Sequence, residues 1–211
     1  MSATGRKATR APADFYATPA WAVEAIMGRV MGRLPDLAPV IFDCGAGDGA
    51  ILSAFSSVYP KAHLQGCELR PVAAARCRAL GFKVSTANWL GSVAPLPSAV
   101  GAIVCNPPYG GHANTAMRFV QGGLQRLQRG ASLWALLRVN WLLDGESTHE
   151  RTTWMKNGPG LPDIYALNAR PSFTGDGQSD ATTYAWMHWV VGLHQDVSAF
   201  HLLEVQDVER R

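Results

Sequence analysis

The tetrapeptide Asn106-Pro107-Pro108-Tyr109 combines residue types that can hold a planar amino group for a reaction. Two consecutive prolines fix the backbone and remove two N–H donors, which leaves the Pro107 carbonyl able to accept a hydrogen bond. The Asn106 side-chain oxygen is a second acceptor, and the Tyr109 ring offers a flat face on which a base or an amide can stack. The alternative is an ordinary type I or II turn.

The residues around this tetrapeptide favour an active-site loop. It directly follows the apolar run 100–105, which predicts a buried strand. Ligands bind at the carboxyl ends of the strands in open α/β sheets, and the tetrapeptide stands at such an end. We therefore treat Asn106, Pro107, Pro108 and Tyr109 as candidate catalytic residues.

A second candidate element is the glycine-rich turn 43–49, which follows the apolar run 40–43 and precedes a helical pattern. Its glycines let the backbone pass close to a bound molecule. Asp43 and Asp48 make the turn acidic, which suits a cationic ligand such as an aminoacyl sulfonium better than a pyrophosphate. A purely structural turn is the alternative.

A third element is Glu68, which ends the predicted strand 62–67. A carboxylate about 20 residues beyond a glycine-rich turn is placed to accept hydrogen bonds from both hydroxyls of a ribose. With Glu68 at this position, a purely structural role for the glycine-rich turn is less favoured.

These elements, in this order, resemble the motifs of class I S-adenosylmethionine-dependent methyltransferases, and within them the amino-methyltransferases with an Asn/Asp/Ser-Pro-Pro-Tyr loop. Segment 14–19 resembles the one before the first strand in small phage-type DNA adenine methyltransferases, and segments 170–180 and 184–189 resemble the hairpin that closes their sheet. The resemblance spans residues 14 to 191. It implies S-adenosylmethionine as cofactor, with these binding residues: Asp14, Phe15, Tyr16, Thr18, Pro19, Asp43, Cys44, Gly45, Gly47, Glu68, Leu69, Asn88 and Trp89.

Asn88 departs from the family's pattern, in which an acidic residue after the third strand receives the amino group of the cofactor's adenine. The amide oxygen of Asn88 can still accept that bond, but it carries no charge. Trp89 and Leu90 are candidate walls for the adenine ring, with plain core or loop as the alternative.

The pattern of elements predicts a Rossmann-like, doubly wound α/β fold with a seven-stranded, mostly parallel sheet. Predicted strands at 40–43, 62–67, 82–87, 100–105 and 131–139 alternate with helical segments at 49–58, 71–80 and 112–128. Thr18 and Pro19 are expected to begin an earlier helix as N-cap and first helical residue. The last strands, near 163–170 and 182–191, are too close for a crossover helix and predict an antiparallel C-terminal hairpin strand.

Length and composition favour one domain. We expect a disordered basic arm at 1–13 and a single methyltransferase domain at 14–211, without a separate target-recognition domain. No window is apolar enough to span a membrane, and no secretory signal is visible, so we expect a cytoplasmic protein. The four cysteines and six histidines show no metal-type spacing, which predicts buried thiols and no metal.

The net charge is only +3, so the chain as a whole is not strongly cationic. Nucleic acid is favoured as the partner only by local groups of basic residues. Arg151 and Lys156 lie in an irregular stretch after the catalytic loop and are our candidates for phosphate contacts. Since no long span remains for target recognition, we expect short-site or relaxed specificity, or a partner or homodimer that supplies recognition.

The function predicted from these residues is methyl transfer to the exocyclic N6 amino group of adenine in DNA. The alternatives are an RNA adenine or protein-glutamine methyltransferase, because related families use the same loop. A catalytically silent nucleic-acid-binding module with this fold is a further alternative, and the intact motifs argue against it.

Overall fold

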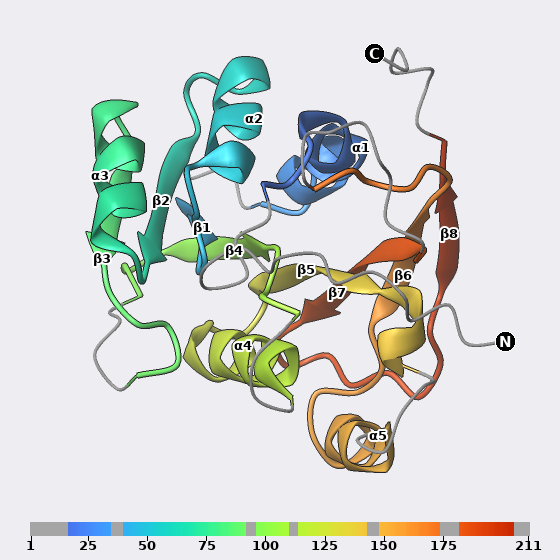
Figure 1. Ribbon diagram of the computed structural model, residues 1–211. Helices are drawn as coiled ribbons and strands as arrows, with labels where there is room; N and C mark the ends of the chain where they lie inside the picture. Colours follow the sequence, from blue (N-terminus) through green and yellow to red (C-terminus); the bar gives the residue numbers. More distant parts are fainter. Residues whose placement is uncertain are drawn as a thin grey trace, which may run out of the picture.

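The computed structural model describes residues 17–34, 40–91, 96–109, 114–142, 148–173 and 182–204 (Figure 1). The helices are α1 (Ala20–Met31), α2 (Ala50–Val58), α3 (Pro71–Ala79), α4 (Thr115–Arg126) and α5 (Thr148–Asn157), with a short 3₁₀ helix at Val139–Leu142. The strands are β1 (Val40–Asp43), β2 (His63–Glu68), β3 (Lys83–Thr86), β4 (Val100–Cys105), β5 (Ser132–Arg138), β6 (Asp163–Leu167), β7 (Tyr184–Val190) and β8 (Phe200–Leu203). The expected arm at 1–13 lies outside the described residues.

The strands form one sheet in the order β3-β2-β1-β4-β5-β7-β6-β8. Neighbouring strands from β3 to β5 run parallel, whereas β7 is antiparallel to both β5 and β6. The predicted fold class, including the antiparallel hairpin strand, is thus confirmed. The predicted number of seven strands was wrong, since β8 pairs in parallel with β6 as an eighth.

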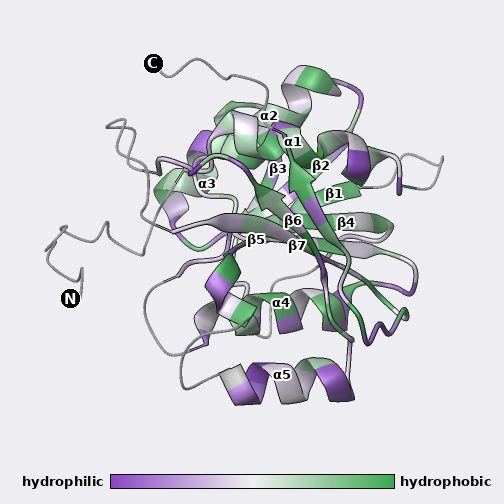
Figure 2. Ribbon diagram, turned by 90° about the vertical axis from the view of Figure 1, so that its right-hand side faces the viewer, coloured by the Kyte–Doolittle hydropathy of each residue, from purple (hydrophilic) through white to green (hydrophobic). Residues whose placement is uncertain are grey.

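Helices cover both faces of the sheet. In both views α1 and α2 lie on one side and α4 and α5 on the other (Figures 1 and 2). In the first core layer, side chains of α1 and α2 pack against β1, β4, β5 and β7. In the second core layer, on the other face of the sheet, side chains of α4 and α5 pack against the central strands. Trp186 and Trp189 of β7 are fully or almost fully buried, one against each face of the sheet, and are core aromatics.

One glycine lets α4 pack closely on the sheet. A Cβ built on Gly123 would overlap Leu133 Cδ1 and lie 3.4 Å from Ile103 Cδ1. Both neighbours are fully buried in the second layer, so neither has room to move aside.

We expect Gly123→Leu to lower the free energy of unfolding by about 1–3 kcal/mol, because it overpacks this contact. Gly28→Leu on α1 is the matched control, since a Cβ on Gly28 meets nothing within 4 Å. The control should be neutral or slightly stabilising, because glycine is a poor helix former. Urea unfolding of both variants measures the difference, and an equal effect at the two positions would contradict close packing at Gly123.

Candidate active site

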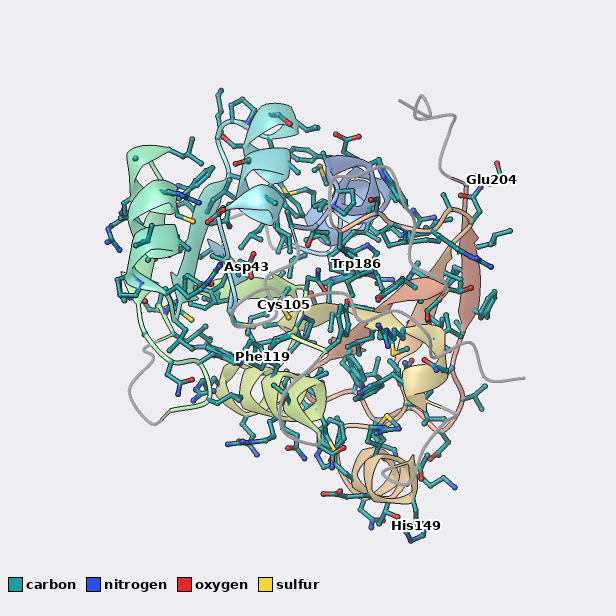
Figure 3. All side chains as sticks on the ribbon, in the orientation of Figure 1. Asp43, Cys105, Phe119, His149, Trp186 and Glu204 are labelled. Carbon is teal, nitrogen blue, oxygen red and sulfur yellow. The ribbon has the colours of Figure 1, made fainter. Side chains whose placement is uncertain are left out.

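The carboxyl ends of β1, β2 and β4 open onto one cavity of about 220 Å³. Asp43 ends β1, Glu68 ends β2, and Asn106 follows β4, so all three predicted elements meet there. Figure 3 marks Asp43 and Phe119, which line the cavity from β1 and from α4. The predicted site residues that line it are Thr18, Asp43, Cys44, Gly45, Gly47, Glu68, Leu69, Asn88, Trp89, Asn106, Pro107, Pro108 and Tyr109.

Three of the remaining candidates cannot be placed here, because Asp14, Phe15 and Tyr16 lie outside the described residues. Pro19 is described but is not among the residues that line the cavity. It is the N-cap of α1, which begins at Ala20. The prediction that Thr18 is the N-cap and Pro19 the first helical residue was therefore wrong by one position.

The glycine-rich turn is tied to β2 by backbone and carboxylate contacts. Asp43 Oδ1 accepts from the Gly45 N–H at 3.0 Å, and Glu68 Oε2 accepts from the Gly47 N–H at 2.9 Å. Gly66 of β2 permits the close approach, because a Cβ there would lie only 2.6 Å from the Asp43 carbonyl oxygen. Gly49 has φ +90°, a left-handed conformation that favours glycine at the start of α2. These specific contacts therefore fix the conformation of the turn beside the cavity.

The carboxylates around this turn make the cavity suitable for a cation. Burial raises the pKa of Asp43 to about 7, the Gly45 hydrogen bond opposes this rise, and the charge of Glu68 adds to it. A positive ligand would favour the ionised form. Asp48 pairs with Arg76 at 3.0 Å through Oδ2, while its Oδ1 is buried without a hydrogen-bond partner among the described residues. That oxygen is an acceptor available for a ligand's donor.

Glu68 is already engaged by the protein at both oxygens. Besides Gly47, it contacts Arg70, whose backbone N–H and side-chain Nε donate to Oε1 at 2.9 and 2.8 Å. A carboxylate has about four acceptor sites, so these three contacts orient Glu68 and leave it about one site for a ligand.

The wall beyond Glu68 is formed by the segment after β3. The side-chain oxygen of Asn88 accepts from the Leu90 N–H at 3.0 Å. Trp89 is only 2% exposed and donates from its indole to the Phe119 carbonyl at 3.2 Å. Arg126 lies over the Trp89 ring, 4.5 Å from its centroid. Trp89 thus belongs both to the core and to the residues that line the cavity.

The side chain of Asn106 is held at both ends. Its Nδ2 donates to Thr18 Oγ1 at 3.0 Å, and its Oδ1 accepts from the Tyr109 hydroxyl. That hydroxyl also lies 2.8 Å from the Leu136 carbonyl of β5, and it carries one proton to share between these acceptors. The Thr18 contact joins residues 88 positions apart, and no local sequence signal predicts it.

The ring of Tyr109 packs against other aromatics. Tyr184 lies edge-on at 5.4 Å between centroids, and Phe173 is tilted at 6.3 Å. The Arg138 guanidinium lies 5.5 Å from the Tyr109 centroid. The ring is half-buried and still lines the cavity, so its stacking on an acceptor remains a prediction.

Arg151 and Lys156 both lie on α5, so the irregular backbone expected for these two residues was wrong. Lys156 is exposed, whereas Arg151 is only 6% exposed and lies over the Trp141 ring. The four cysteines are buried free thiols, as predicted. Among the described residues, no helix is long and apolar enough to cross a membrane, and no cluster of His, Cys, Asp or Glu could hold a metal.

No protein-family model matches the chain, and no curated protein sequence matches it. Its structure is similar to that of a Listeria monocytogenes protein described as a class I S-adenosylmethionine-dependent methyltransferase. The TM-score is 0.71 at 12% identity, over 90% of this chain and 67% of the other. The methyltransferase subunit of a type I restriction-modification system from Streptococcus thermophilus gives a TM-score of 0.72 at 13% identity, over 89% and 47%.

The chain has the class I methyltransferase fold. The EcoKI M protein, from a type I restriction enzyme, gives a TM-score of 0.61 at 18% identity over 88% of this chain and 47% of its own. The chain thus spans about half the length of these two restriction-modification subunits. In this methyltransferase fold, the cavity described above lies at the carboxyl ends of the parallel strands.

Proposed function

We propose that the protein is an S-adenosylmethionine-dependent methyltransferase of the small phage-type group that methylates the N6 amino group of adenine in DNA. The observation that carries this proposal is the meeting of Asp43, Glu68 and the 106–109 tetrapeptide at one cavity. Each was singled out by its own residue pattern, and the fold brings the three together.

The residues present fit the cofactor. The buried acceptor Asp48 Oδ1 and the carboxylates of Asp43 and Glu68 suit a positively charged ligand with ribose hydroxyls. Asp43 and Gly45 would hold its methionine part, Glu68 its ribose, and Asn88 and Trp89 its adenine. When bound, S-adenosylmethionine supplies an electrophilic methyl group on a sulfonium.

The tetrapeptide would position the acceptor amino group. Asn106 Oδ1 and the Pro107 carbonyl accept from its two N–H bonds, which orients the nitrogen lone pair towards the methyl group. These acceptors become more important as the nitrogen turns sp³ and its N–H bonds become more acidic. No strong general base is needed, and the rate gain comes from positioning and electrostatics.

Adenine in duplex DNA must leave the base stack before it can reach this loop, at a cost of about a few kcal/mol. Stacking on Tyr109 and contacts between basic residues and phosphates would offset that cost. Lys156, exposed on α5, is proposed as one such contact. RNA adenine and protein glutamine are the competing acceptors for the same loop.

Two similar structures favour DNA among these acceptors. They are described as a methyltransferase subunit of a type I restriction-modification system and as the EcoKI M protein of a type I restriction enzyme. Because the first of them is described as a subunit, we also propose that a partner chain or a second copy contributes target recognition.

Labelled S-adenosylmethionine tests the proposed function directly. The protein is incubated in parallel with unmethylated DNA, RNA and ribosomal protein, and mass spectrometry of the digested products identifies the methylated atom. We expect N6-methyladenine from DNA. Label in RNA adenine or in glutamine would reassign the substrate, and absence of cofactor binding by calorimetry would favour the silent module.

The raised pKa of Asp43 gives a pH prediction for cofactor binding. Below about pH 7 the free protein holds a proton on Asp43, and a nearby positive charge expels that proton. Affinity should therefore rise by about fivefold between about pH 6 and pH 7 and by about a further twofold above pH 7 before it levels off. Calorimetry in buffers of different ionisation enthalpy should detect the released proton. Asp43→Asn should remove both the release and the pH dependence; a pH-independent wild type would contradict this role.

A further inference from the structure

Residues 87–91, which follow β3, are called the wall segment here, because residues 87–90 line the cavity. The segment turns on itself, with the Gly91 N–H donating to the Asn88 carbonyl at 3.0 Å. It is attached to α4 where the Trp89 indole donates to the Phe119 carbonyl at 3.2 Å. The position of this side of the cavity therefore depends on how the segment is held against α4.

Arg126, the last residue of α4, makes a second attachment between the helix and the wall segment. Its Nη1 donates to the Gly122 carbonyl and its Nη2 to the Gly91 carbonyl, both at 3.1 Å. Its guanidinium also lies over the Trp89 ring, 4.5 Å from the centroid. Because a guanidinium is planar, it can stack on an indole and still donate in its own plane to two carbonyls. One side chain thus joins Gly122 of the helix to Trp89 and Gly91 of the wall segment.

A glycine leaves the space in which this guanidinium lies. A Cβ built on Gly122 would be 2.7 Å from Arg126 Nη1 and 3.4 Å from Trp89 Nε1. Arg126 is half-buried, and it is not among the described residues that line the cavity. Its effect on a ligand would therefore pass through the wall segment.

We propose that Arg126 is a positioning residue for the cofactor, because it fixes the wall segment against α4 and with it the surface that receives the adenine of S-adenosylmethionine. The inference rests on the proposed function, since it takes S-adenosylmethionine to be the ligand of the cavity. Asp43 and Asn106 are held by other contacts, so the methyl group and the acceptor loop stay in place when Arg126 is lost. The KM for the cofactor should then rise while kcat changes little.

Calorimetric binding of S-adenosylhomocysteine to Arg126→Met is the first test. We expect affinity to fall by about 3- to 30-fold, as for the loss of a cation–π contact and a hydrogen bond from a charged donor. Arg126→Lys keeps the charge but lacks the planar fork, so it should bind almost as weakly as Arg126→Met. Arg118→Met, an exposed position on the same helix, is the matched control and should bind like the wild type.

Gly122→Ala tests the same contact without removing Arg126. The new methyl group should displace the guanidinium tip and weaken S-adenosylhomocysteine binding by about 2- to 10-fold. Urea unfolding should show no loss of stability, since alanine is a better helix former than glycine. The double variant should bind no more weakly than Arg126→Met alone, because the two changes remove one contact.

A ligand without adenine separates positioning of the wall segment from a general weakening of the cavity. S-ribosylhomocysteine has the amino acid and the ribose, and its inhibition constant in competition with S-adenosylhomocysteine should be the same in Arg126→Met and the wild type. An equal loss for both ligands overturns the role of Arg126, and so does full affinity in Arg126→Lys. Unchanged binding of S-adenosylhomocysteine by Arg126→Met overturns this role alone and leaves the proposed function standing. A wild type that binds neither ligand overturns both.

Discussion

Replacing Asn106 by alanine is expected to lower methylation turnover by about 10²-fold or more, while cofactor affinity barely changes. Asn106 Oδ1 is an acceptor for the amino group whose importance grows as the nitrogen becomes sp³. The stabilisation that is lost is therefore larger in the transition state than in the bound complex, so the variant should lower kcat. Steady-state methylation of the substrate identified by labelling, with cofactor affinity measured separately, checks this expectation.

Two milder variants separate the chemistry from the support of the amide. Thr18→Val removes the hydroxyl that accepts from Asn106 Nδ2, and Tyr109→Phe removes the hydroxyl that donates to Oδ1. Each leaves Asn106 in place with one anchor fewer, so each should reduce turnover less than Asn106→Ala. Thr18→Ser keeps the hydroxyl and serves as control. If Asn106→Ala turns over almost as fast as the wild type, the tetrapeptide is only a turn.

The sequence predicted the position of the site because strand ends carry its residues. Asp43, Glu68 and Asn106 each follow or end an apolar run, and parallel strands present their carboxyl ends at one edge of the sheet. Apolar runs and turn residues are local features of the sequence. They sufficed to predict β1, β2 and β4, and hence the meeting of these three side chains. Their role in binding and catalysis stays a prediction.

Contacts between distant segments could not be predicted in this way. The bond from Asn106 to Thr18 and the placement of Arg138 beside Tyr109 depend on how α1 and β5 pack, which no local pattern encodes. Strand β8 was missed for a related reason. It has four residues at the sheet edge, only Leu203 is buried, and its pairing with β6 stabilises it. The burial of Arg151 likewise arises from tertiary packing of a helix with little amphipathic signal.

Replacing Glu68 by alanine is expected to weaken cofactor binding by about 1.5–3 kcal/mol, the cost of losing charge-assisted hydrogen bonds. This corresponds to a loss of affinity of about 10- to 150-fold. Glu24→Ala, an exposed carboxylate on α1, controls for the change in net charge. Calorimetry with S-adenosylhomocysteine measures both variants without turnover, and unchanged affinity in Glu68→Ala would remove Glu68 from the site.

The contacts of Glu68 within the protein require one more comparison, because alanine also removes the acceptor for the Gly47 N–H and for Arg70. A 2′-deoxy analogue of S-adenosylhomocysteine separates the two roles. If Glu68 accepts from the ribose, the wild type should bind the deoxy analogue more weakly than the parent, and Glu68→Ala should bind the two more nearly alike. If the variant instead loses the same factor for both ligands, Glu68 acts by holding the glycine-rich turn. The energetic coupling between the hydroxyl and the carboxylate therefore distinguishes a direct ligand contact from support of the turn.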